Sequence, residues 1–211
     1  MTLVAGVDDA GRGPVIGPLV IAGVLLKESD IPKLQPLGVK DSKLLSPRRR
    51  ESLEPEILRL AVRHEALFLS PYEIDDHVLN GKRLRRLNWL EAKTMAKVVE
   101  ELRPEIAYLD ASDIDEERFG RQVQELIPFP IQIVSKHNAD RDNLAVAAAS
   151  ILAKVNRDRA VAELREVYGD FGSGYPSDPR TIRFLRDCAR RSAFPDCVRR
   201  SWKTLKRISG P

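Results

Sequence analysis

Two apolar runs rich in β-branched residues lie close together at the start of the chain, at residues 3–7 and 19–26. Runs of this length and composition are typical of buried β-strands. The Gly- and Pro-rich segment 9–18 that joins them is too elaborate for a simple hairpin turn. The sequence therefore predicts two adjacent strands with a functional loop between them, and the rest of the fold has to accommodate that sheet.

Strand and helix patterns alternate after these two runs. A helix that starts at Ser46 and Pro47 is expected to split or kink at Pro55. Further on, the sequence predicts strands at 64–69, 106–109 and 131–134, helices at about 84–102 and 116–126, and a long helix capped by Asn143 that stops at Gly169. Strands first and alternation afterwards predict an α/β fold, a mixed β-sheet flanked by helices, with an antiparallel portion from the early strands.

The length of 211 residues suits one domain with an appendage. We predict a catalytic domain at 1–178 and a basic C-terminal helical segment at 179–211 packed on it. Between Arg180 and Arg207 ten Lys or Arg residues stand against two Asp residues, a local charge of +8. Such a segment is either a solvated helix face or a surface for a phosphate-rich partner.

Several classes of protein are disfavoured by composition. No apolar stretch reaches the roughly 18 residues that span a bilayer, so no membrane partner is expected. Asp8 and Asp9 interrupt the N-terminal apolar run, which argues against a signal peptide and predicts a cytoplasmic protein. Cys188 and Cys197 lack the spacing of a zinc site. Structural thiols are the preferred interpretation, and a disulfide stays open.

Four aspartates stand out because each follows an apolar run or lies in a turn that leads into a helix. They are Asp8, Asp9, Asp110 and Asp140. Ligand sites of open α/β sheets form beside the carboxyl ends of strands, and a few carboxylates from separate elements suffice to hold Mg²⁺. Two ions about 4 Å apart support phosphodiester hydrolysis. Taken singly, each aspartate is better explained by turn hydrogen bonds or a helix dipole. Their placement together favours a metal site, and spacing alone predicts a metal-dependent enzyme of undefined substrate.

Six short motifs follow one another along the chain in a fixed order. They are GVDDAGRGP at 6–14, DSK at 41–43, YLD at 108–110, KHNAD at 136–140, AASILAK at 148–154 and GSGYPSDP at 172–179. Together they closely resemble ribonuclease HII, with the archaeal branch nearest, and the resemblance extends from Gly6 to about residues 202–204. It implies the ribonuclease H-like fold, an α/β architecture with a mixed β-sheet flanked by helices and a C-terminal helical segment.

The resemblance implies an endoribonuclease that hydrolyses the RNA strand of RNA/DNA hybrids. It also implies cleavage 5′ of single ribonucleotides embedded in duplex DNA with two Mg²⁺ or Mn²⁺ ions, leaving 3′-hydroxyl and 5′-phosphate ends. The implied role is ribonucleotide removal from DNA and primer removal, by a monomer. An alternative is a catalytically weakened hybrid-binding protein, because Asp9 stands where the family usually has glutamate.

The metal-binding roles are carried over residue by residue. Asp8, Asp110 and Asp140 match three of the family's four metal-binding carboxylates, and Asp9 occupies the fourth position. Aspartate is shorter than glutamate by one methylene, so its oxygens retreat by about 1.5 Å. This difference predicts either backbone compensation around Asp9 or a relaxed metal preference, such as Mn²⁺ over Mg²⁺.

Substrate-binding roles are also implied by the resemblance. Gly11, Arg12 and Gly13 are expected to read the 2′-hydroxyl and the backbone at the RNA-to-DNA junction, because glycines permit close approach of the main chain. Tyr175 is expected to stack beside the deoxyribose that follows the ribonucleotide.

Three further residues lie within the matching motifs. Lys43 and Lys154 are expected to neutralise phosphates near the ions, with solvated or structural roles as the alternative. His137 precedes Asp140 in its motif, and we expect it to make a supporting hydrogen bond rather than to act as a base. No histidine is assigned a catalytic part.

Overall fold

The computed structural model describes residues 2–81 and 86–209. The strands are β1 (Leu3–Ala10), β2 (Leu19–Lys27), β3 (Arg63–Leu69), β4 (Ile106–Asp110) and β5 (Gln132–Lys136). The α-helices are α1 (Leu34–Leu37), α2 (Pro47–Leu60), α3 (Pro71–Asn80), α4 (Arg86–Leu102), α5 (Glu116–Glu125), α6 (Ala139–Asp142), α7 (Leu144–Tyr168), α8 (Pro179–Arg190) and α9 (Lys203–Ser209). Short 3₁₀ turns occupy η1 (Glu28–Lys33) and η2 (Ser42–Leu44).

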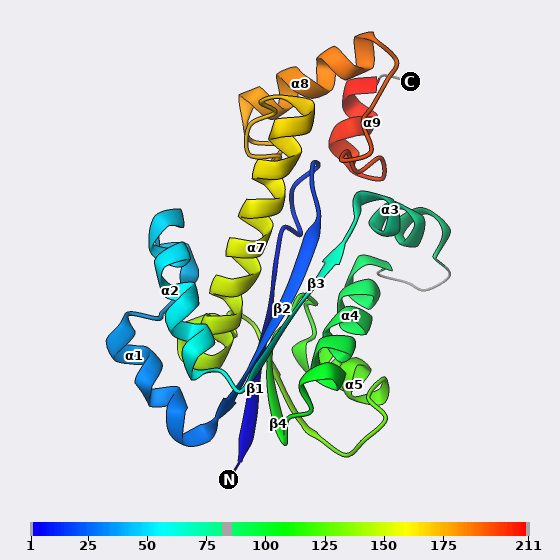
Figure 1. Ribbon diagram of the computed structural model, residues 1–211. Coiled ribbons are helices and arrows are strands. Elements are labelled where there is room, and N and C mark those ends of the chain that lie inside the picture. The colour runs from blue at the N-terminus through cyan, green and yellow to red at the C-terminus, as the bar shows by residue number, and fades with distance from the viewer. Residues whose placement is uncertain (1, 82–85, 210–211) are drawn as a thin grey trace. The chain divides into compact units, whose positions relative to one another are not determined.

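The five strands form one mixed sheet in the order β3-β2-β1-β4-β5 (Figure 1). β1 runs antiparallel to β2 and parallel to β4, and β4 runs parallel to β5. The predicted α/β fold, with its antiparallel early strands, is confirmed. β1 is central because its apolar residues are buried on both faces, which is the environment that an uninterrupted apolar run favours.

Two layers of helices cover the sheet (Figure 1). On one face, Val7 and its neighbours pack with α4 and α5. On the other face, α2 and the alanine-rich first half of α7 pack against β2. The β1 backbone lies so close to α7 that a Cβ built on Gly6 would meet the carbonyl carbon of Ala145 at 2.1 Å. Only glycine fits there, so this position lets the backbones of β1 and α7 pack in direct contact.

Two helices differ from expectation. α2 continues through Pro55, so the predicted split is wrong; Leu53 and Ile57 are buried on either side of the proline, and their packing outweighs the lost hydrogen bond. α3 was not predicted, although Ser70 and Glu73 form a capping box before it. The first residues of the helix predicted at 84–102 lie outside the described residues, and α4 is described from Arg86.

Backbone contacts divide the chain into two compact units. Unit 1 comprises Met1–Ala10, Val20–Leu67 and Asn88–Asn156, and it holds most of the sheet with its covering helices. Unit 2 comprises Gly11–Leu19, Phe68–Leu87 and Arg157–Pro211. Unit 2 has its own apolar core, in which Ile16, Phe171 and Leu185 are fully buried. The predicted domain at 1–178 and segment at 179–211 stay a prediction.

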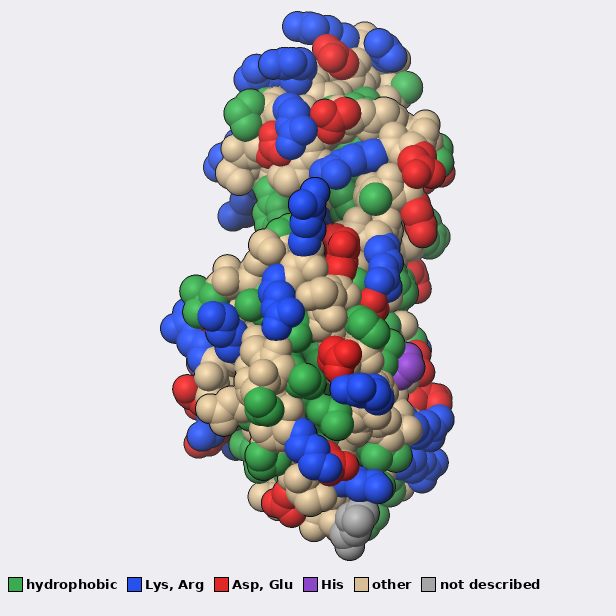
Figure 2. Space-filling model, turned by 60° about the vertical axis from the view of Figure 1, so that its left-hand side comes forward, with side chains coloured by type: hydrophobic (Ala, Val, Ile, Leu, Met, Phe, Trp, Pro, Cys, Tyr) green, Lys and Arg blue, Asp and Glu red, His purple; other side chains and the backbone are tan. Residues whose placement is uncertain are grey.

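The basic C-terminal residues lie mainly on α8 and after it. Lys and Arg side chains gather at the end of unit 2 that carries α8 (Figure 2), and Arg183, Arg186 and Arg190 are exposed there. Cys188 and Cys197 are both free thiols. Within the described ranges, no helix is long and apolar enough to cross a membrane.

Candidate active site

Asp8 and Asp9 lie inside β1, which continues to Ala10, three residues beyond the apolar run. The turn predicted around them therefore begins only at Gly11. Successive side chains of a strand point to opposite faces. Asp8 is buried and accepts a hydrogen bond from Ser150 of α7, whereas Asp9 Oδ2 accepts one from Ser112 Oγ at 3.1 Å, in the segment after β4.

Asp110 and Asp140 come from neighbouring elements. Asp110 is the last residue of β4, as predicted, and its Oδ1 accepts a hydrogen bond from the N–H of Ala139 at 2.8 Å. Asp140 lies in the short helix α6 and is 1% exposed. Because α6 starts directly after β5 turns at Asn138, which has a left-handed backbone with φ of 52°, the two carboxylates meet beside the carboxyl ends of β4 and β5.

Lysines surround this group of carboxylates. Lys43 Nζ lies 3.5 Å from Asp140 Oδ2. Lys154 Nζ donates to Ser150 Oγ at 2.7 Å, and Ser150 Oγ lies 2.8 Å from Ser42 Oγ. The structure thus brings both predicted lysines to the carboxylates, while Ser42 and Ser150, which sequence reasoning missed as site residues, connect η2 to α7.

The electrostatics of the cluster are dominated by burial and mutual repulsion. The pKa of Asp8 is raised well above its ordinary value, first by burial and then by the charges of Asp9 and Asp110, while Lys154 lowers it. Burial also raises the pKa of Asp110, although the hydrogen bond from Ala139 opposes that shift. Both shifts show negative charge that the protein alone does not compensate.

The donor set fits a hard divalent cation. Asp140 Oδ1 is buried and has no hydrogen-bond partner among the described residues, and carboxylate oxygens are the ligands that Mg²⁺ and Mn²⁺ favour. As the side chains stand, no three acidic, His or Cys residues within 2–81 and 86–209 converge into a ready-made coordination group. Repulsion between uncompensated carboxylates opposes such convergence, so we expect a cation to draw them together.

His137 has the supporting role that the sequence suggested. Its Nδ1 lies 3.2 Å from the carbonyl oxygen of Ala111 and its Nε2 lies 3.1 Å from that of Ile114. Hydrogen bonds to Ile114 and Ala111 raise the pKa of the imidazole. Both ring nitrogens face carbonyl oxygens on either side of Ser112, so the ring holds the segment whose Ser112 hydroxyl donates to Asp9.

The predicted substrate-binding residues Gly11, Arg12, Gly13 and Tyr175 all belong to unit 2. Gly11 has a φ of +96°, which favours glycine. A Cβ built on exposed Gly13 would lie 3.5 Å from Cε1 of the Tyr175 ring. The structure therefore brings Gly13 and Tyr175 together.

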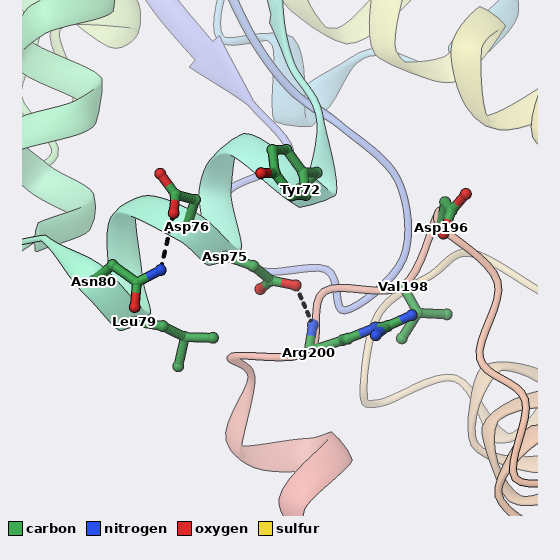
Figure 3. A pocket seen from close by; sticks show the side chains of 8 residues that line it. All are labelled: Tyr72, Asp75, Asp76, Leu79, Asn80, Asp196, Val198 and Arg200. Atoms are coloured by element: carbon green, nitrogen blue, oxygen red, sulfur yellow. Dashed lines mark hydrogen bonds between the residues drawn. The ribbon is translucent and has the colours of Figure 1, made fainter.

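Further residues of unit 2 that the sequence did not single out adjoin the same loop. The guanidinium of Arg157 lies over the Tyr175 ring at 5.2 Å, and the side chains of Arg199 and Trp202 donate to carbonyl oxygens of the loop. The one sequence feature that could have indicated these residues was the tryptophan inside the basic segment. A separate hollow of unit 2 is lined by Asp75, Asp76 and Asp196 (Figure 3), whose negative charge disfavours phosphate.

Comparisons with known proteins place these observations in a family. The family model described as Ribonuclease HII matches residues 5–205. A ribonuclease HII of Thermococcus sibiricus is 51% identical over 206 residues, covering 96% of this chain and 89% of the relative. The crystal structure of the ribonuclease H2 from Pyrococcus horikoshii OT3 superposes with a TM-score of 0.90 at 41% identity, covering 98% of this chain and 97% of that one. The ribonuclease HII in a PCNA complex from Archaeoglobus fulgidus gives 0.88 at 43% identity, with coverage of 99% and 97%.

Proposed function

Because the chain belongs to the ribonuclease HII family, as the resemblance predicted, we propose that it cuts the RNA strand of RNA/DNA hybrids and cuts 5′ of single ribonucleotides embedded in duplex DNA. At the coarser level, the family makes it a metal-dependent ribonuclease H hydrolase that acts on nucleic acid. The observation that carries the proposal is the interaction of the Asp110 charge with those of Asp8 and Asp140, with the buried Oδ1 of Asp140 lacking a protein partner among the described residues.

We propose that Asp8, Asp9, Asp110 and Asp140 hold two Mg²⁺ or Mn²⁺ ions during catalysis. When bound, such ions supply a polarised water and neutralise the charge that develops on phosphorus and on the leaving oxygen. The protein positions the carboxylates: Ser150 orients Asp8, the Ala139 N–H orients Asp110, and Ser112 orients Asp9. Each carboxylate is fixed by a different element, which limits its movement when charge changes in the site.

Lys43 and Lys154 supply positive charge beside the carboxylates. Lys43 is half-exposed, with 51% of its side chain accessible, and Lys154 is partly buried. A cation beside a carboxylate cluster lowers the cost of bringing a negatively charged phosphate towards it. We assign both lysines to phosphate neutralisation, with Lys43 the more accessible to a nucleic-acid backbone.

The substrate-reading part of the proposal rests on Gly11, Arg12, Gly13 and Tyr175. Gly13 is exposed and Tyr175 is 38% exposed, so a sugar can reach both. A main chain without a Cβ permits close approach, and the 2′-hydroxyl is the group by which a protein distinguishes RNA from DNA. Tyr175 would lie against the following deoxyribose, whose missing hydroxyl leaves room for the ring.

We propose that the products carry 3′-hydroxyl and 5′-phosphate ends, and that the protein removes ribonucleotides and primers from DNA. Single cuts of this polarity leave an end that a polymerase extends. We also propose that the protein acts as a monomer.

The test is cleavage of a labelled DNA duplex with one embedded ribonucleotide, with Mg²⁺ and Mn²⁺ run in parallel and Asp110→Asn as the control. The expected result is one cut on the 5′ side of the ribonucleotide that the control does not make. Cutting of long hybrids alone would remove the single-ribonucleotide claim. Hybrid binding without cleavage under either ion would favour a binding protein weakened by Asp9.

A further inference from the structure

Arg199 is a fully buried arginine that donates to three carbonyl oxygens of one loop. Its Nη2 donates to the carbonyl of Gly11 at 2.7 Å, its Nη1 to that of Arg12 at 3.1 Å, and its Nε to that of Gly17 at 2.9 Å. The planar fork of a guanidinium can reach several acceptors at once, which a lysine ammonium on its flexible stem cannot do with the same geometry. Arg199 therefore clamps both ends of the loop.

Trp202 completes the clamp. Its Nε1 donates to the carbonyl of Gly13 at 3.1 Å, and its ring lies 4.8 Å from the guanidinium carbon of Arg199. Three consecutive carbonyls, those of Gly11, Arg12 and Gly13, are thus held by two side chains of one short segment.

The segment that carries the clamp is itself fixed. The N–H of Arg199 donates to the carbonyl of Val15 at 2.8 Å. Asp75 of α3 accepts hydrogen bonds from the N–H of Arg200 at 2.6 Å and from the N–H of Ser201 at 2.9 Å (Figure 3). Because the N–H groups of Arg199 and of the two residues that follow it are all hydrogen-bonded, the backbone that carries the clamp has little freedom to follow a displaced loop.

The contacts of the loop carbonyls also determine where the N–H groups of Arg12 and Gly13 point. A trans peptide places the carbonyl of one residue and the N–H of the next on opposite sides, and no described peptide bond is cis. Because the carbonyls of Gly11 and Arg12 face Arg199, the N–H groups of Arg12 and Gly13 point away from it. In the part of the chain that the structure describes, the Gly13 N–H donates to no backbone carbonyl, and Gly13 lies beside the Tyr175 ring.

We propose that Arg199 and Trp202 are positioning residues that aim the Arg12 and Gly13 N–H groups at the sugar and phosphate of the ribonucleotide. This inference rests on the proposed function and goes beyond it, since it assigns substrate discrimination to side chains that never touch the substrate. A buried guanidinium is costly to desolvate, and the carbonyls that it binds compensate for that cost while fixing the loop.

The first variant for the test is Trp202→Phe, which keeps an aromatic ring at this position and removes the N–H that binds Gly13 together with part of the indole. We expect kcat/KM on the single-ribonucleotide duplex to fall about tenfold, because loss of one positioning hydrogen bond displaces the reading groups. Affinity for an all-DNA duplex should change less than about twofold, since no phosphate-binding charge is removed. Arg199→Lys should lower kcat/KM about a hundredfold, because an ammonium at the end of a flexible stem cannot reach the three carbonyls with the geometry of the guanidinium fork.

Phe184→Leu is the matched control for a loss of packing. Phe184 packs against Phe171 in the core of unit 2, with the rings tilted by 58° and their centroids 5.8 Å apart, and its side chain has no N–H or O–H that could donate to a loop carbonyl. We expect this variant to lower the melting temperature while its kcat/KM, measured well below melting, stays within about twofold of the parent. Trp202→Phe should reverse that order, with about a tenfold fall in kcat/KM and a smaller loss of melting temperature than Phe184→Leu.

Parental kcat/KM in Trp202→Phe would overturn the proposal, as would a loss matched by equal losses in DNA affinity and melting temperature. If Arg199→Lys does not fold, Trp202→Phe decides alone. If the parent cuts hybrids but not single ribonucleotides, the proposed function is corrected and the same variants are compared on the hybrid. The two failures are therefore distinguishable.

Discussion

The carboxylate cluster of unit 1 and the Gly11–Gly13 loop of unit 2 are built in opposite ways. In the cluster, charged side chains project from strands and a short helix, and burial raises the pKa values of Asp8 and Asp110. In the loop, the working groups are main-chain N–H groups, and the charged side chain, Arg199, is fully paired behind them.

Because of this difference, substitutions in the carboxylate cluster should change activity without lowering stability, whereas substitutions that release the Gly11–Gly13 loop should lower both. Residues that collect like charge reduce the stability of the fold, so neutralising one should lower activity without lowering stability. Residues that hold a loop by its carbonyls contribute to both, because the same hydrogen bonds fix the fold and aim the N–H groups. Variants in the two regions should therefore give different patterns of loss.

The largest expected effect is that of Asp110→Asn. We expect kcat to fall at least about a thousandfold, because a carboxylate that holds a catalytic cation is replaced by a neutral amide. The free energy of unfolding at pH 7 should stay equal or rise, since the amide oxygen still accepts from the Ala139 N–H and the repulsion with Asp140 and Asp9 is relieved. Denaturant unfolding and single-turnover cleavage measure the two quantities, and a marked loss of stability would contradict the comparison.

A glycine pair gives the next largest effect. Gly6→Ala should lower the free energy of unfolding by about 3 kcal/mol, because the new Cβ meets the α7 backbone at 2.1 Å, where little can move. Gly13→Ala is the matched variant in unit 2: its Cβ meets only the Tyr175 ring, at 3.5 Å. We expect its stability to change by less than about 0.5 kcal/mol while cleavage falls. Thermal melts and kcat/KM separate the two; equal stability losses would contradict the assignment of Gly13 to an open reading surface.

The elements that the sequence predicted well are those whose pattern is local. The apolar runs of β1 and β4 end near Asp8 and Asp110, so their aspartates were placed at one edge of the sheet. Asn143 was expected to cap the long helix, and its Oδ1 accepts from the N–H groups of Ala145 and Val146. Propensity and capping depend on residues a few positions apart, which is why these elements could be predicted from the sequence.

The contacts that complete the site join residues far apart in the chain and could not be predicted from the sequence. Ser42 and Ser150 meet across 108 residues of sequence, and no periodicity links them. Arg199 was counted among the charges of a basic segment, yet it is fully buried because its acceptors lie 182 to 188 residues earlier. A charge count gives the sign of a side chain but not its partner, so the clamp required the tertiary structure.

The third prediction concerns Asp9, where this chain departs from its family. Asp9→Glu extends the carboxylate by about one carbon–carbon bond, roughly 1.5 Å. We expect the Mg²⁺-supported rate to rise about tenfold relative to the Mn²⁺-supported rate, because Mg²⁺ demands stricter geometry. Ser112→Ala is the control, since it removes the hydrogen bond that orients Asp9 and leaves the length of the Asp9 side chain unchanged. An unchanged ratio of the two rates would show that the backbone around Asp9 already compensates.

The smallest effect is expected at Asp178, in the turn that carries Tyr175. Hydrogen bonds from the N–H groups of Ser173 and Arg180 hold the pKa of this carboxyl well below its usual range. A depressed folded pKa means that the stabilisation is complete above the unfolded pKa of about 3.9 and is lost as pH falls through the folded value. Thermal melts from pH 6 down to about pH 2 should therefore show a shallower acid loss in Asp178→Asn than in the parent.

Asp187→Asn is the matched control for this last measurement, because Asp187 pairs with the exposed Arg190 side chain at 3.1 Å and caps no turn. It should follow the acid loss of the parent. Asp178 shares one property with each region. It is a carboxylate, like the residues of the cluster, and it is held by hydrogen bonds that involve the main chain, like the loop. If Asp178→Asn also lowers cleavage at neutral pH, the Tyr175 turn is positioned from α8 as the Gly11–Gly13 loop is from Arg199. If cleavage is unchanged there, main-chain positioning is confined to the Gly11–Gly13 loop.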